Sequence, residues 1–159
     1  MPSLVGSEMC IRDRPMPAHR PLHVRDCQGT LWAFYRHYKG QAWASFEGDL
    51  SSLKLDELPG STTQETCALK RQTISPTMDF IVVPITDSTI DMLKLRLSAR
   101  GTLGRNGSVI HTQIAVGDDL LLSACDNFHD DATGASLSVP EHFLLEIKNL
   151  GLLRAYGAA

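Results

Sequence analysis

The 159-residue chain lacks most of the motifs by which a function is recognised in a sequence. It has no CxxC pair and no Cys/His spacing typical of a zinc site. It also has no P-loop, no dinucleotide-binding glycine turn, no HExxH helix and no nucleophile elbow. No apolar run approaches the roughly 20 residues that cross a bilayer. These absences exclude the commonest enzyme signatures, predict no cofactor and predict no membrane partner.

A strong excess of charge of either sign is also missing. The formal net charge is −3, which argues against a generally basic surface for nucleic acid. With 43% hydrophobic and 21% charged residues, the composition is that of an ordinary globular protein with one core. We therefore expect a small soluble domain for which nucleic acid is an improbable partner.

The start of the chain does not follow the pattern of a fold. Residues 3–14, SLVGSEMCIRDR, resemble the translated end of a transposon adapter used in sequencing libraries, which recurs in metagenomic gene predictions. The stretch has neither the apolar core of a signal peptide nor helix or strand periodicity. We predict that residues 1–15 are disordered and foreign to the fold, that Met16 is the native start, and that residues 16–159 form one domain.

Without this segment the cysteines number three, Cys27, Cys67 and Cys125. An odd number at long, irregular spacings does not suggest a disulfide framework. Three reduced thiols in a cytoplasmic protein are the simplest interpretation.

The first half of the domain, residues 16–78, is rich in aromatic residues and then in turn residues. Six of the ten aromatics lie between Leu31 and Leu50 around a Lys39-Gly40 turn signal. Aromatic enrichment predicts a β-hairpin with strands at about 31–38 and 42–47, followed by a long polar connection. Whether this hairpin is buried or exposed is left open by the sequence.

The second half, residues 79–159, has cleaner periodicity. Apolar runs predict strands at 79–85, 108–116, 120–126 and 152–156, with Pro84 favouring an edge position for the first. Apolar stripes at helical spacing predict one helix capped by Thr86 and another capped by Ser138 with Glu141. The order is βαββαβ, so we predict an α+β fold with an antiparallel sheet in the ferredoxin-like, split βαβ arrangement.

In this arrangement the helices cover one sheet face and the other face is available to a partner. Alternation along residues 108–116 places His111 and Gln113 on that second face. We predict that a protein or small molecule binds there.

The loop after the central hairpin, Asp126–Asp131, and the strand residues beside it carry the candidates for chemistry. His111 could activate Cys125 as a nucleophile, because a nearby imidazolium favours the thiolate. His129 could act as an acid–base group oriented by Asp126. Alternatively, a divalent metal could be held by carboxylates and one imidazole, from Asp126, His129, Asp130 and Asp131.

Three functions follow from these features. The leading hypothesis is a non-enzymatic binding or interaction domain whose ligand the sequence does not identify. The first alternative is a small hydrolase or metal-dependent enzyme that uses His111, Asp126 and His129. The second is single-stranded nucleic-acid binding by stacking on Trp32, Tyr35 and Trp43.

Overall fold

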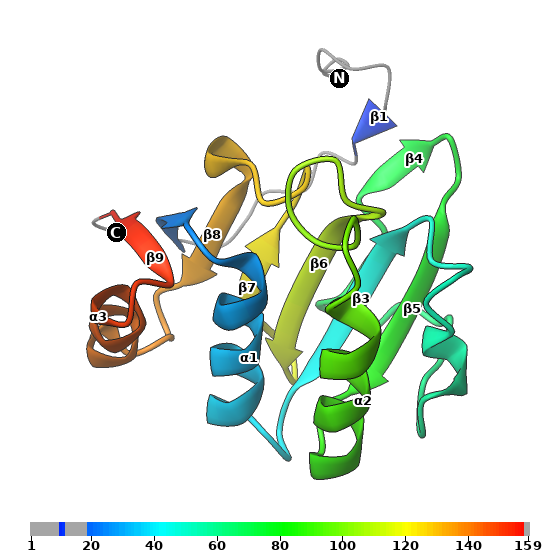
Figure 1. Ribbon diagram of the computed structural model, residues 1–159, viewed down its shortest axis with the longest axis horizontal. Coiled ribbons are helices and arrows are strands. Elements are labelled where there is room, and N and C mark those ends of the chain that lie inside the picture. The colour runs from blue at the N-terminus through cyan, green and yellow to red at the C-terminus, as the bar shows by residue number, and fades with distance from the viewer. Residues whose placement is uncertain (1–9, 12–18, 158–159) are drawn as a thin grey trace.

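The protein has an α+β fold built on one antiparallel sheet, seen in a computed structural model that describes residues 10–11 and 19–157 (Figure 1). Seven strands lie side by side in the order β5-β3-β6-β7-β8-β2-β9, and β1 pairs separately with β4. The strands are β1 (Cys10–Ile11), β2 (His19–Val24), β3 (Trp43–Gly48), β4 (Thr73–Ser75), β5 (Asp79–Pro84), β6 (Val109–Val116), β7 (Asp119–Ala124), β8 (Thr133–Ser136) and β9 (Leu153–Tyr156). The α-helices are α1 (Cys27–His37), α2 (Asp87–Leu97) and α3 (Glu141–Asn149), and short 3-10 turns are η1 (Leu55–Glu57) and η2 (Asp130–Ala132).

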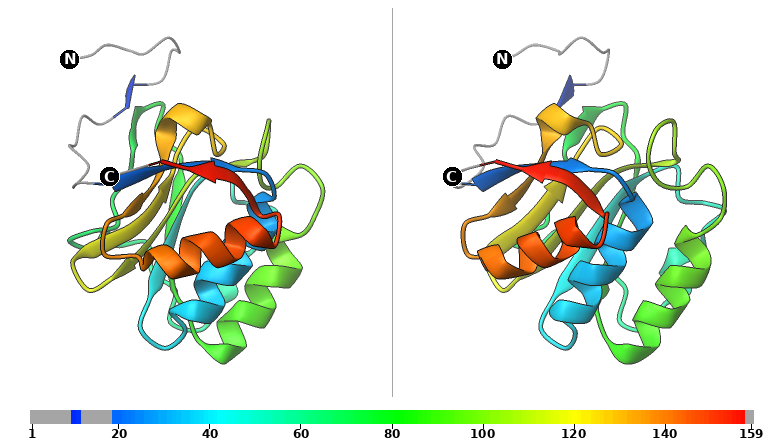
Figure 2. Two further views of the ribbon diagram at one scale, coloured as in Figure 1. Left: turned by 90° about the vertical axis from the view of Figure 1, so that its left-hand side faces the viewer. Right: turned by 60° about the vertical axis from the view of Figure 1, so that its left-hand side comes forward.

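The three helices lie on one side of the sheet (Figure 2). Helices α1 and α2 run next to each other across its middle, and α3 packs against β9 at one end. None of the helices in the described residues has the length and apolar content needed to cross a membrane.

Register assigns each side chain of the central strands to one sheet face. Ile81, Phe46 and Thr112 form one cross-strand row, and Phe80, Glu47 and His111 form the next. Because side chains alternate along a strand, successive rows point to opposite faces. The first row faces the helices, where Phe46 and Ile81 join the main hydrophobic core. The second row faces away from them.

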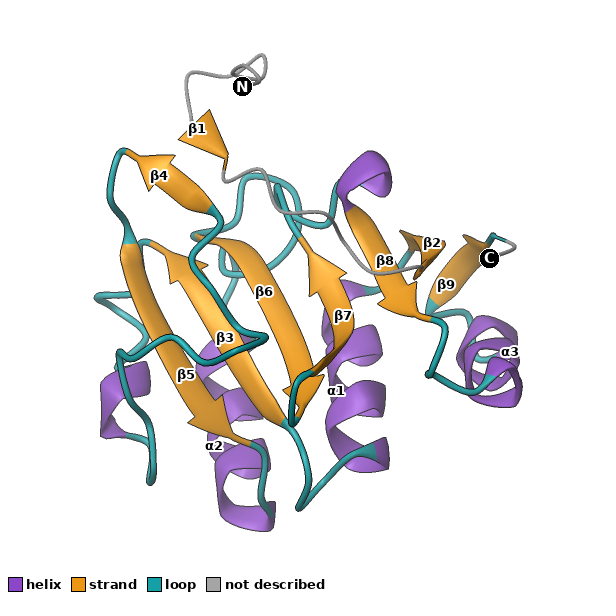
Figure 3. Cartoon of the chain, turned by 180° about the vertical axis from the view of Figure 1, so that it is seen from behind, coloured by secondary structure: helices purple, strands orange, loops and turns teal. Residues whose placement is uncertain are grey.

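The face away from the helices is covered by the chain itself. Residues 66–75, here called the strap, cross this face of β3 and β6 (Figure 3). His111 and Gln113 do point to this face, as alternation predicts, but they are only 2% and 1% exposed beneath the strap. The predicted binding surface around them is therefore wrong, because a connection without periodicity gives no sign of where it packs.

The βαββαβ order of residues 79–159 is not confirmed as a ferredoxin-like sheet. In the sheet, strand β3 lies between β5 and β6. Along the chain, an additional strand, β8, comes between β7 and helix α3. Strand β2 lies in a segment for which we predicted no strand, and it pairs with β8 and β9. Residues outside the βαββαβ pattern thus complete the sheet. Two details are confirmed: the hairpin of β6 and β7, and the edge position of β5.

The predicted hairpin at 31–47 is half wrong, because its first arm is helix α1. Asp26 caps this helix by accepting a hydrogen bond from the Gly29 N–H at 2.9 Å. Leu31, Phe34 and Tyr35, at i, i+3 and i+4, are buried against the core. Because this run is so rich in aromatics, its apolar residues fit both strand alternation and helical spacing. The N-cap at Asp26 favours the helix.

The predicted nucleic-acid platform is also wrong. Tyr35 is fully buried on the helix side of the sheet, while Trp43 is 39% exposed and pairs across the sheet with Ala115 on the strap side. Rings on opposite sides of a sheet cannot stack successive bases of one strand.

Helix α2 begins with the predicted Thr86 cap, whereas α3 does not use Ser138. Ser138 bonds instead to Ser136 and Asp119, and α3 starts without a side-chain cap. The apolar spacing after Ser138 also includes Leu150, but this residue follows the last turn of α3 and is 64% exposed.

Candidate functional site

A left-handed turn follows β7 and contains three successive non-glycine residues with positive φ. Asp126, Asn127 and Phe128 have φ of 52°, 56° and 64° in succession. A non-glycine residue in this region costs roughly 1–2 kcal/mol, and such strain persists only where the surroundings hold it. The cost of the three together identifies this turn as a place where the fold is held against its local preference.

Contacts from several directions hold the turn. The Asn127 side-chain amide donates to the carbonyls of Gly107 and Val109 at 3.0 and 3.1 Å, and its backbone N–H donates to Ile110 O at 2.8 Å. Phe128 is inserted into the main core. Asn tolerates the left-handed region better than most residues, so its place in the middle of the turn has a local reason.

His111 of β6 hydrogen-bonds to the first residue of the turn, Asp126. Its Nδ1 accepts the Asp126 N–H at 3.1 Å, so the neutral ring carries its proton on Nε2, which lies 2.8 Å from Thr73 Oγ1. Burial lowers the pKa of His111 to about 4, although the nearby Asp126 carboxylate opposes the shift. The ring is therefore neutral at physiological pH and hydrogen-bonds to Asp126 and Thr73 at the same time.

The turn and η2 form part of the wall of a broad hollow of about 810 Å³. The end of β2, the start of α1, the loop before β6 and the outer strand β9 supply the rest of the wall. Its side chains are Val24, Cys27, Arg105, Asn106, Asp126, Asn127, Phe128, His129, Asp130, Asp131 and Arg154. Elements far apart in the sequence thus converge at one end of the sheet.

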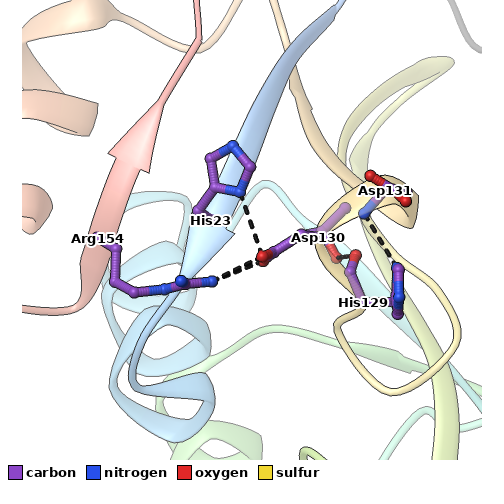
Figure 4. Close-up of polar contacts among 6 residues, drawn as sticks. His23, His129, Asp130, Asp131 and Arg154 are labelled. Carbon is purple, nitrogen blue, oxygen red and sulfur yellow. Dashed lines mark hydrogen bonds and ion pairs between the residues drawn. The ribbon is translucent and has the colours of Figure 1, made fainter.

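One side of the hollow is tied together by Asp130 (Figure 4). The Arg154 guanidinium donates to both carboxylate oxygens at 2.9 and 2.7 Å, and His23 Nδ1 lies 3.5 Å from one of them. The hydrogen bond from Arg154 is the main cause that lowers the pKa of Asp130. These contacts join β2, β9 and η2, so Asp130 fixes this wall of the hollow.

The four predicted metal ligands gather at the hollow without forming a metal-binding group. Asp130 is bonded to a cation, and His129 Nδ1 accepts the Asp131 N–H at 3.1 Å. Across residues 10–11 and 19–157, no three His, Cys, Asp or Glu side chains are placed to share a metal ion.

The predicted catalytic residues are neighbours with separate contacts. His111 meets Asp126 through the backbone N–H, and the His129 ring serves Asp131. Cys125 is half-buried, with its Sγ 3.5 Å from Ser123 Oγ. A catalytic role for His111, Cys125, Asp126 and His129 stays a prediction.

Sequence reasoning missed the other half of the hollow: Val24, Cys27, Arg105, Asn106 and Arg154. These residues come from three separate segments between positions 24 and 154, and no motif joins them. The one available signal was the Gly104–Gly107 loop, which resembled no known phosphate loop.

A scan against protein-family models, a search of curated proteins and a search of solved structures each found no match.

Proposed function

We propose that the protein is a small ligand-binding domain and that the hollow beside the 126–128 turn is its binding site. The observation that carries the proposal is the strained turn itself, because strained backbone held by its surroundings clusters at ligand sites. Elements far apart in the sequence hold it, and it opens onto a polar hollow large enough for a small molecule.

The contacts of the wall indicate which chemistry the ligand needs. Arg154 and Asp130 satisfy each other, whereas the exposed guanidinium of Arg105 has no acceptor within the described part of the chain. Asp126 and Asp131 present carboxylates to the same space. The site favours a polar molecule that offers an anionic group to Arg105 and hydrogen-bond donors to the carboxylates.

We also propose that the protein is located in the cytoplasm. Cys27, Cys67 and Cys125 are not joined in disulfides, and a reducing compartment keeps thiols in that state.

The test is a screen of small carboxylates, phosphates, amino acids and sugars by ligand-observed NMR, with thermal shift as a second readout. A binder should lose about tenfold to a hundredfold in affinity in the Arg105→Gln variant, since a charge-assisted hydrogen bond contributes roughly 1.5–3 kcal/mol. Arg100→Gln is the matched control, because Arg100 is exposed in the same connection between α2 and β6 but does not line the hollow.

Two results would contradict the proposal. One is that no compound class binds the wild-type protein. The other is a binder whose affinity is equal in wild type, Arg105→Gln and Asn127→Gly, since the last variant removes the amide that holds the turn. Substrate turnover in the same screen would instead favour the hydrolase alternative.

A further inference from the structure

The strap lies on the sheet through directional contacts. The Glu47 carboxylate accepts the Gln72 and Thr73 N–H groups at 2.7 and 3.2 Å, and Gln113 accepts the Lys70 N–H at 3.3 Å. Only Ala68 and Leu69 of the strap join the apolar cluster on this face. The position of the strap therefore depends on hydrogen bonds at its 70–73 segment more than on a broad hydrophobic contact.

His111 joins this strap to the left-handed turn. It is the cross-strand partner of Glu47 in the register of β3 and β6, and its two ring nitrogens contact Thr73 on one side and Asp126 on the other. A neutral imidazole has one donor and one acceptor, so the roles of the two nitrogens cannot be chosen independently. A change at the Thr73 end changes what the ring can do at the Asp126 end.

We infer that the strap and the 126–128 turn form one conformational device, in which His111 transmits the position of the strap to the turn. When Thr73 leaves the ring, the buried Nε2–H loses its acceptor, and the ring rotates or exchanges tautomers to recover one. Either response weakens the bond from the Asp126 N–H to Nδ1. The strained turn then relaxes, because one of the contacts that held it is gone.

This coupling goes beyond the proposed binding function and holds whether or not the hollow binds a ligand. It also makes the outer side of the strap a place from which the hollow is controlled. By linkage, any molecule that displaces the strap changes the turn, and any molecule that orders the turn stabilises the strap.

The test compares two identical substitutions in the strap. Thr73→Val removes the hydroxyl that meets His111, whereas Thr66→Val removes a hydroxyl that accepts only the Leu69 N–H within the strap. Amide hydrogen exchange at Asp126 is measured by NMR, with the Ile114 amide at the centre of β6 as the reference for global opening.

We expect exchange at Asp126 to become about fivefold faster or more in Thr73→Val, relative to Ile114, as the loss of one net hydrogen bond predicts. The nitrogen chemical shifts of the His111 ring should move at the same time. Thr66→Val should leave both readouts as in wild type.

Equal Asp126 exchange in the two variants, with an unchanged His111 tautomer, would overturn the inference. If Thr73→Val lowers global stability, the Asp126-to-Ile114 ratio still separates local from global opening. Because neither readout uses a ligand, failure here is distinct from failure to find a binder.

Discussion

The two faces of the sheet are held in different ways. On the helix side, Phe34, Leu93, Ile114 and Leu144 belong to one continuous apolar core. On the strap side the apolar cluster is small, and Glu47, His111 and Gln113 lie buried beside it. A hydrophobic face tolerates many arrangements of similar volume, whereas buried polar groups accept only the arrangement that pairs them. The helix face therefore supplies most of the stability, and the strap face specifies one geometry.

Truncating one buried leucine on each face should give the largest losses of stability and should differ between the two faces. Leu93 and Leu69 are both fully buried, the first on the inner face of α2 and the second in the strap. We expect Leu93→Ala to lower the free energy of unfolding by about 3–5 kcal/mol and Leu69→Ala by about 2–3 kcal/mol, since a thin cover collapses into a cavity more easily than a core does. Urea denaturation of both variants measures the two losses. Equal losses would mean that the strap is as much a part of the core as the helices.

Acid should act on the strap face through His111. Its pKa is about 4 in the folded state against an ordinary 6.5, so the unfolded chain binds more protons between these values. Stability contributed by this group is therefore complete above pH 6.5 and falls as the pH drops towards 4. With about 1.4 kcal/mol per pKa unit, the loss is on the order of 3 kcal/mol.

The measurement is the slope of unfolding free energy against pH in wild type and in His111→Gln. Gln has an acceptor for the Asp126 N–H and a donor for Thr73, so the fold should survive at a lower level of stability. The acid slope between pH 6.5 and 4 should flatten in this variant. Parallel slopes would show that His111 titrates in the native state without cost. Burial raises the pKa of Glu47, so its contribution to stability falls as the pH rises, opposite to that of His111. Glu47 is present in both proteins, so the difference between their slopes reports His111.

Substitution in the surface cluster around Asp130 should give the smallest loss of stability. The contacts of Asp130 with Arg154 and His23 resemble those under the strap in chemistry but are partly exposed. We expect Asp130→Asn to lower stability by only about 0.5 kcal/mol, because exposed ion pairs are screened by water. Asp131→Asn is the control, since within residues 10–11 and 19–157 only the backbone N–H of Asp131 makes a hydrogen bond. Thermal unfolding at low and high salt compares them, and a loss above about 2 kcal/mol would place this cluster with the buried network.

Sequence reasoning found those parts of the fold whose signals are local. The hairpin of β6 and β7, strand β5 and the Thr86 cap follow from alternation, apolar runs and capping chemistry. Helix α1 was missed because an aromatic run fits two periodicities. The Asp126–Asp131 loop, which we predicted to carry the candidate site residues, lines the hollow, and its role stays a prediction. Its left-handed backbone has no sequence signature apart from Asn127.

By itself, then, the sequence determined an α+β chain, the central hairpin and a polar loop at its end. Tertiary structure alone decided that β3 separates β5 from β6, that the strap covers His111, and that Arg105 and Arg154 share the hollow with Asp126. The physical reason is that periodicity reports which face of an element is buried but not what buries it. Pairings between distant segments are chosen by the total burial and hydrogen bonding of the folded chain, which no short stretch of sequence contains.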